Sequence, residues 1–223
     1  MFTTVNFPKY IDDRIAFYNQ LKLFVIQEEH LSKPILIDAN FMDRLNNNFQ
    51  KFLQRRLEPT KFTQSENREL KELMKKVFPE TMEIFNHHDP TIYWFKINYS
   101  NGLTNDKIVN EYFIVRDKHK GKGWWTKVSK LRSSSKTEIL YLGKIETAFQ
   151  NRFIQHIGLG HSYTTSMKLQ MWMNNVEGMS LTFQFLKLDR KWKKYTEDIE
   201  KVLWDATQPL LGASSRIQNA EVS

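Results

Sequence analysis

The stretch from Thr137 to His156, TEILYLGKIETAFQNRFIQH, changes its hydrophobic period partway along, and this change constrains the fold more than any other feature of the chain. Residues 139–142 are a short apolar run that favours a β-strand, and Gly143 ends the run. From about Thr147 onward, apolar residues recur at helical spacing. The stretch therefore predicts a strand that leads through a glycine into a helix.

Four side chains near this junction can bind or activate phosphate oxygens: Tyr141, Lys144, Arg152 and His156. Tyr141 and Lys144 stand at the end of the predicted strand. Arg152 and His156 are four residues apart, so they share one face of the predicted helix. We expect all four side chains to converge on one small volume.

This pattern resembles the second motif of the GIY-YIG nuclease family, which reads Tyr-x-Gly-Lys and is followed by a helix with Arg and often His. A second block, residues 199–212, strengthens the resemblance. There, Glu200 is followed by the apolar pair Leu203 and Trp204 and, nine residues on, by Pro209. The family's metal-binding glutamate has this spacing. The resemblance covers the C-terminal part of the chain and none of residues 1–90.

The resemblance implies a phosphodiester hydrolase whose catalytic residues are Tyr141, Lys144, Arg152, His156 and Glu200. It assigns Glu200 to one divalent cation, Mg²⁺ or Mn²⁺, since such hard cations prefer oxygen ligands. Arg152 would stabilise charge on the phosphate, and Tyr141 would orient or deprotonate water, assisted by Lys144 or His156. A tyrosine needs nearby cations to act as a base at neutral pH, and Lys144 and Arg152 supply them.

Two positions depart from the family pattern. The first half of the motif, Gly-x-Tyr, is expected on the preceding strand, where Gly123-Trp124-Trp125 stands. Trp125 has no phenolic oxygen, and Tyr112 is the alternative source of a hydroxyl. Gly212 stands where the family usually has asparagine, which removes a side-chain hydrogen bond.

The whole net charge of +8 lies in the C-terminal part of the chain. Residues 1–95 hold 13 basic and 13 acidic residues, whereas residues 96–223 hold 20 and 12. A basic region that also carries the motifs suits a nucleic-acid partner, for which we expect double-stranded DNA. The candidate nucleic-acid contacts are Lys120, Lys122 and Trp125 in one loop and Lys191, Lys193 and Lys194 in a second run. A surface connection and a solvated face are the respective alternatives.

The composition excludes several classes of site. The sequence has no cysteine, so disulfides, thiolate metal sites and a cysteine nucleophile are excluded. It has no apolar run of membrane-spanning length, and its start lacks the order of a secretion signal. We therefore expect a cytoplasmic protein that contacts no membrane.

Residues 1–90 carry apolar stripes at 3.6-residue spacing and predict three helices. The first covers residues 11–25, the second is capped by Asp38 and ends before Pro59, and the third begins with a capping box from Thr63 to Glu66. This region would serve a protein partner or a homodimer. Residues 87–90, HHDP, are interpreted as a turn and not as a metal cluster.

From Thr91 the pattern changes to β. Strands are predicted over residues 91–100, 110–117, 123–131, 137–144 and 181–188, and a further helix over 166–173. The predicted fold class is α+β: a helical N-terminal region, residues 1–90, precedes a GIY-YIG-like domain, residues 91–223. That domain would have an extra N-terminal β-hairpin and a three-stranded antiparallel sheet flanked by helices.

These features predict a DNA endonuclease of restriction, phage defence or DNA repair. The alternative is a non-catalytic or partner-activated nucleic-acid-binding protein on the same scaffold. The two differ in whether function depends on a metal and on Glu200.

Overall fold

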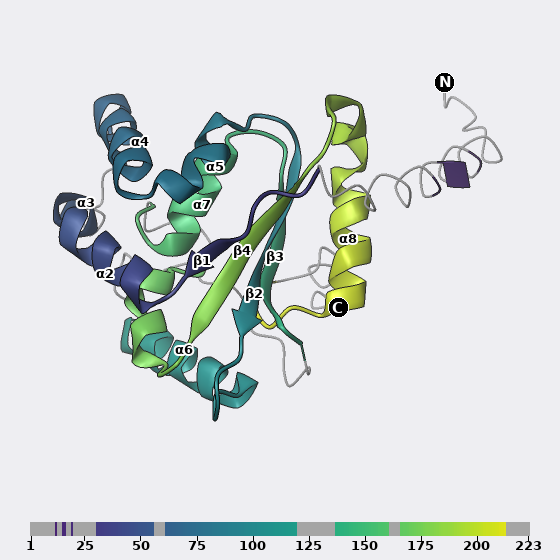
Figure 1. Cartoon of the computed structure of the whole chain (residues 1–223). Coiled ribbons are helices and arrows are strands. Elements are labelled where there is room, and N and C mark those ends of the chain that lie inside the picture. The colour runs from purple at the N-terminus through teal and green to yellow at the C-terminus, as the bar shows by residue number, and fades with distance from the viewer. Residues whose placement is uncertain are drawn as a thin grey trace, which may run out of the picture.

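The computed structural model describes residues 30–55, 61–119, 137–160 and 166–212, and the single positions 12, 15, 16 and 19. Within these residues, four strands form one antiparallel sheet with helices on both faces (Figure 1). In the order β1-β4-β2-β3 across the sheet, the strands are β1 (Ile35–Ile37), β4 (Ser180–Lys187), β2 (Thr91–Asn98) and β3 (Ile139–Ile145). The α+β class is confirmed. No helix in these ranges is long and apolar enough to cross a membrane.

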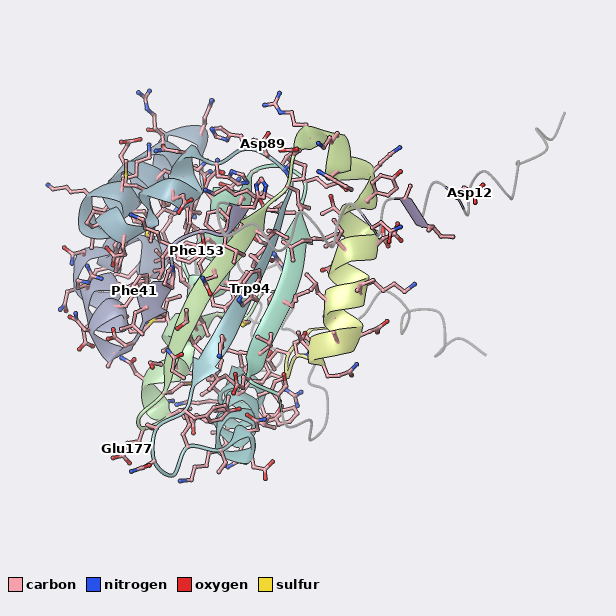
Figure 2. All side chains as sticks on the ribbon, turned by 45° about the vertical axis from the view of Figure 1, so that its right-hand side comes forward. Asp12, Phe41, Asp89, Trp94, Phe153 and Glu177 are labelled. Carbon is pink, nitrogen blue, oxygen red and sulfur yellow. The ribbon has the colours of Figure 1, made fainter. Side chains whose placement is uncertain are left out.

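The central strand β2 sends alternate side chains to two separate cores. Tyr93, Phe95 and Ile97 belong to the larger core, while Ile92 belongs to the smaller one. Figure 2 shows Phe41 and Phe153 among the helices on the larger side, with α8 along the other side. Two-sided burial explains why the predicted strands are so rich in aromatic and branched residues.

Six of the described helices contribute to the larger core. They are α2 (Ala39–Asn48), α3 (Gln50–Arg55), α4 (Gln64–Val77), α5 (Met82–Asn86), α6 (Asn105–His119) and α7 (Phe149–Ile157), with a 3₁₀ turn, η2 (Pro79–Thr81), before α5. Two of the predicted starts are confirmed. Asp38 caps α2 by accepting from the Phe41 N–H at 2.9 Å, and Thr63 forms the capping box of α4. The predicted helix after Gly143 is α7.

The smaller core lies beneath a 3₁₀ segment, η5 (Arg190–Tyr195), and helix α8 (Thr196–Thr207). After α8 the chain turns at Gln208, which has a left-handed φ of 47°, and then runs beside β3. The N–H groups of Leu210 and Leu211 donate to the carbonyls of Ile139 and Leu140 at 2.9 and 2.8 Å. These bonds cover part of the free edge of β3, which ties α8 to the strand that carries Tyr141.

The prediction of three strands and of an entirely helical N-terminal region was wrong. β1 is a fourth strand that comes from residues 1–90 and pairs with β4, so that Ile35 lies opposite Phe183. It has only three residues, which is too short for a periodicity signal to be seen. The larger core therefore contains residues from both sides of the predicted boundary at residue 90.

The strand predicted over residues 110–117 was also wrong, because this segment lies within the helix α6 (Asn105–His119). Its aromatic and branched residues favour a strand, but Ile108, Tyr112 and Val115 recur at helical spacing and are buried. The Thr104 hydroxyl accepts from the Lys107 N–H at 3.3 Å and so caps the helix. The helix cap and the burial of these side chains outweigh their intrinsic preference for a β-strand.

The helix predicted over residues 166–173 is replaced by two 3₁₀ turns, η3 (Leu169–Met171) and η4 (Met173–Asn175). Lys168 has a left-handed φ of 52°, and a continuous right-handed helix cannot pass through that conformation. The strand predicted over 123–131 and most of the helix predicted over 11–25 lie outside the described residues.

The capping box of α4 stabilises the helix, so its removal is expected to lower the free energy of unfolding measurably. The Thr63 hydroxyl accepts from the Glu66 N–H at 3.1 Å, and the Glu66 carboxylate accepts from the Thr63 N–H at 2.7 Å. We expect Thr63→Ala to lower the free energy of unfolding by about 1 kcal/mol in urea titrations. Thr63→Ser keeps the hydroxyl and is expected to retain most of the stability. Equal losses in both variants would contradict the capping role.

Candidate active site

Two tyrosine rings meet above Gly143. Tyr93 on β2 lies opposite Gly143 on β3, and Tyr141 comes two residues earlier on β3 and faces the same core. The two rings lie with centroids 6.0 Å apart and planes 24° apart. A Cβ atom at Gly143 would lie 2.7 Å from the Tyr93 hydroxyl oxygen and 2.8 Å from the Tyr141 Cε1 atom. Only glycine leaves room for this pair.

The guanidinium of Arg152, on α7, joins the two tyrosines. Its Nε–H donates to the Tyr93 oxygen and its Nη2–H to the Tyr141 oxygen, each at 3.1 Å, while Nη1–H donates to Gln155 Oε1 at 3.2 Å. The planar fork is thereby fixed in orientation. Burial opposes the charge, but the Tyr93 and Tyr141 oxygens raise the pKa of Arg152, which stays protonated.

His156 lies behind Tyr93 and is completely buried. Its Nδ1 accepts from the Met167 N–H at 3.3 Å, so in the neutral ring the proton resides on Nε2. Nε2–H then donates to the Tyr93 oxygen at 3.0 Å. Burial, together with the charges of Arg152 and Lys168, lowers the pKa of His156 well below its ordinary value. His156 is therefore neutral and has no surface with which to contact a substrate.

These contacts fix the direction of each proton in the cluster. The Tyr93 oxygen accepts from Arg152 and His156, so its own proton is left for Tyr141. Burial, and next the neighbouring Tyr141, raise the pKa of Tyr93 well above its ordinary value, so Tyr93 keeps that proton. The Tyr141 oxygen accepts from Arg152 Nη2–H at 3.1 Å. Tyr141 and Arg152 are both half-buried, whereas Tyr93 and His156 are buried, so Tyr141 and Arg152 are the members of the cluster that can meet a ligand.

Glu200, on α8, is anchored to the edge of β3 because its carboxylate accepts from the backbone N–H of Lys144. Burial raises the pKa of Glu200 to about 7, and the charge of Glu197 adds to this effect. The charges of Lys144 and Arg152 and the Lys144 N–H act in the opposite direction and lower the pKa of Glu200. The half-buried carboxylate would be stabilised as an anion by a further cation.

The structure joins three of the residues that the sequence analysis placed in the catalytic site, Tyr141, Arg152 and His156, through Tyr93. Glu200 lies on α8 beside Lys144, and the charge of Arg152 lowers its pKa. The predicted lysines Lys191, Lys193 and Lys194 line a pocket that also includes Lys144. Trp192, between them, is buried in the smaller core and is not positioned to stack on a base. Lys120, Lys122 and Trp125 lie outside the described residues.

Tyr93 is the residue that the sequence analysis missed. The alternative hydroxyl source, Tyr112, lies on α6 and packs edge-on against Trp172 with ring centroids 5.4 Å apart, not in the cluster. One sequence signal could have pointed to Tyr93. This tyrosine is the third residue of Thr91-Ile92-Tyr93, on a strand that was predicted correctly. Its pairing with Gly143 is a long-range register that periodicity alone does not reveal.

Gly212 lies against the same tyrosine. It has a left-handed φ of 120°, and a Cβ atom there would lie 3.5 Å from the Tyr141 Cε2 atom. Leu211, just before it, forms a parallel bridge with Tyr141. The segment after α8 therefore packs beside the tyrosine, and the positive φ gives a reason for glycine at this position.

Comparisons with protein-family models, curated proteins and solved structures found no match to this chain.

Gly143 gives a direct test of this arrangement. We expect Gly143→Ala to separate the rings of Tyr93 and Tyr141 and to lower the free energy of unfolding by about 1–3 kcal/mol, as overpacking does. The His156 Nε2–H resonance, measured by NMR, should shift because its acceptor moves. Ala148→Gly, at a residue with a left-handed φ of 56°, serves as the control and should leave that resonance unchanged. An unchanged resonance in Gly143→Ala would contradict the packing described.

The raised pKa of Glu200 predicts that the free energy of unfolding depends on pH. Its pKa is raised from 4.5 to about 7, so the folded state holds an extra proton between these values, and the resulting stability is lost as pH rises through 7. Glu200→Gln keeps an oxygen acceptor for the Lys144 N–H and removes the charge. We expect this variant to gain about 1–3 kcal/mol over wild type at pH 8, and little at pH 4, in urea titrations. Asp205→Asn, at an exposed carboxylate of the same helix, should show no such gain.

Proposed function

We propose that this chain is a divalent-metal-dependent nuclease that hydrolyses phosphodiester bonds in DNA. The observation that carries the proposal is the Arg152 guanidinium, fixed between the oxygens of Tyr93 and Tyr141. The half-buried carboxylate of Glu200, whose pKa the charge of Arg152 lowers, supports it. A fixed planar cation and a carboxylate that requires a cation are complementary to a phosphodiester and its metal ion. The resemblance of the Tyr141 and Glu200 segments to GIY-YIG nucleases supports the same conclusion.

Glu200 would hold the cation, and Mg²⁺ or Mn²⁺ suits its carboxylate oxygens. Among the described residues there is no group of three or more His, Asp or Glu that could hold a metal ion. Glu200 would therefore share the ion with water and substrate phosphate oxygens, as is common for Mg²⁺. Such an ion supplies Lewis-acid stabilisation and a more acidic bound water.

The remaining residues have distinct roles in this proposal. Arg152 stabilises the charge that develops on the scissile phosphate. Tyr141 orients the attacking water through its hydroxyl, whose oxygen Arg152 holds in place at 3.1 Å. Lys144, whose ammonium lies 3.6 Å from Glu197, adds a cation that can meet the leaving oxygen. His156 is a positioning residue, because its only route to the substrate passes through Tyr93.

We assign the role of the tyrosine in the family's first motif to Tyr93. In the sequence, this tyrosine was expected at the position of Trp125. The family expects this tyrosine on the strand paired with the Tyr-x-Gly strand, and β2 is paired with β3. The tyrosine pair is then complete, and the apparent lack of a first-motif tyrosine in the sequence does not argue against activity.

Cleavage assays with purified protein test the proposal. We expect plasmid DNA to be cut in Mg²⁺ or Mn²⁺ and not in EDTA, with single-stranded DNA and RNA run alongside to establish the preferred substrate. Arg152→Lys and Glu200→Gln should each reduce the rate by about 10²-fold or more, since each removes a group that stabilises charge in the transition state.

Two matched controls accompany these variants. Arg116→Lys changes an arginine on α6 that pairs with Asp117, and Asp205→Asn changes an exposed carboxylate in the last turn of α8. Both should keep rates within a few-fold of wild type. DNA binding without cutting in any metal, unaffected by Arg152→Lys and Glu200→Gln, would instead support the non-catalytic or partner-activated alternative.

A further inference from the structure

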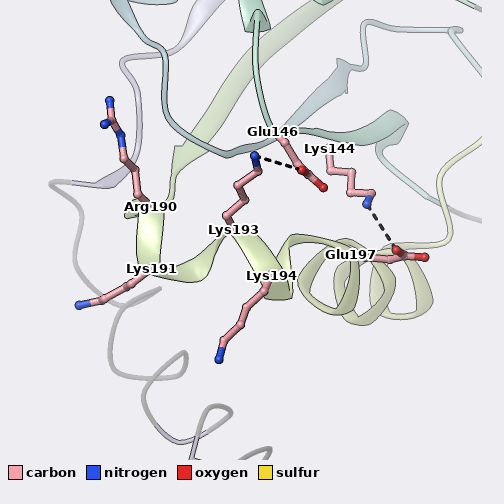
Figure 3. Close-up of a pocket in the computed structure, with 7 residues that line it drawn as sticks. All are labelled: Lys144, Glu146, Arg190, Lys191, Lys193, Lys194 and Glu197. Carbon is pink, nitrogen blue, oxygen red and sulfur yellow. Dashed lines mark ion pairs between the residues drawn. The ribbon is translucent and has the colours of Figure 1, made fainter.

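A basic pocket of about 420 Å³ adjoins the candidate active site (Figure 3). Its cationic lining residues are Lys144, Arg190, Lys191, Lys193 and Lys194. Its acidic lining residues are Glu146 and Glu197. Two of the cations also pair with acidic residues outside the lining, Arg190 with Asp89 at 2.8 Å and Lys191 with Asp189 at 3.1 Å, so cations exceed anions by one. Lys144 belongs to both places, since its backbone N–H holds Glu200 while its side chain lines the pocket.

The local fold explains why so many cations point outward here. Trp192 is buried in the smaller core and anchors the 3₁₀ segment η5. Its neighbours in the tight turn cannot enter the same core, so Lys191 and Lys193 stay exposed, with 70% and 53% of their side-chain surfaces accessible. Burial of one aromatic residue thus creates a fixed ridge of positive charge beside Lys144.

The acidic residues hold two of these cations only loosely. Figure 3 shows Lys193 turned toward Glu146 and Lys144 turned toward Glu197, at 3.7 and 3.6 Å. These distances exceed those of a direct hydrogen bond, and exposed pairs of this kind contribute about 0–1 kcal/mol. An entering anion can therefore exchange with the carboxylates at little cost.

We propose that this basic pocket binds the backbone phosphate of a nucleotide adjacent to the scissile bond. The inference rests on the proposed nuclease function and extends it by defining the substrate as a strand that continues past the cut. The pocket's lining side chains are all charged, and lysine and arginine commonly contact phosphate oxygens. The pocket is therefore complementary to the charge of the DNA backbone.

Binding measurements on Glu200→Gln protein test this pocket whether or not the chain cleaves DNA. Fluorescence anisotropy with a labelled short duplex would compare a Lys191→Gln, Lys193→Gln, Lys194→Gln triple variant with the parent. We expect affinity to fall by about tenfold to a hundredfold and the slope of log K against log salt to fall by about 2–3, as lost phosphate contacts require. The matched control removes three lysines from α4, in Lys71→Gln, Lys75→Gln and Lys76→Gln, and should change affinity less than threefold.

A scan of single methylphosphonate substitutions locates the contact. Each substitution removes one backbone charge, and we expect a position next to the scissile bond to weaken binding of the parent protein. That penalty should vanish in the Lys191, Lys193 and Lys194 triple variant, because the charge that met the phosphate is gone.

Three outcomes would overturn the proposal: no weakening by the pocket variant, equal weakening by the α4 control, or a methylphosphonate penalty that persists in the pocket variant. Absence of cleavage with these binding results intact would count against the nuclease function and leave the pocket as a phosphate site.

Discussion

The guanidinium of Arg152 and the two tyrosine oxygens that hold it are the contact on which the rest of the site depends. The contact requires β2 and β3 to pair so that Tyr93 lies opposite Gly143, and it requires glycine there to admit both rings. It also requires α7 to place Arg152 and His156 on one face above the sheet. Strand register, glycine and helix phase therefore serve one hydrogen-bonded cluster.

The cluster lies in surroundings that would disfavour polar groups if their hydrogen bonds were incomplete. The Tyr93 ring is packed among Phe149, Phe183 and Phe95, with centroids 5.5, 6.3 and 6.4 Å away. Every polar atom named in the cluster has a partner, which avoids the cost of a buried unpaired group. Glu200 differs because burial raises its pKa to about 7, so the folded protein bears the cost of its charge. Retention of such a destabilising carboxylate is typical of a functional site.

Much of this site could be predicted from sequence, because its parts are local. The Tyr141 to His156 segment contains its own strand, glycine and helix, and the Asp38 and Thr63 caps are encoded within four residues. Tyr93 could not be assigned in this way, since its bond to His156 spans 63 residues and depends on strand register. β1 is too short to show a period, and in α6 the β-favouring residues conceal a helical spacing. The errors thus occur where tertiary contacts outweigh local preference.

The central proposal is that Glu200, a half-buried carboxylate, binds a divalent cation. The most direct measurement is the titration of the Glu200 side-chain carboxyl by ¹³C NMR, with and without Mg²⁺. The account predicts a midpoint near 7 without metal and a clear fall of the midpoint when Mg²⁺ is added, because the cation favours the ionised form. A midpoint near 4.5 that does not respond to Mg²⁺ would contradict it.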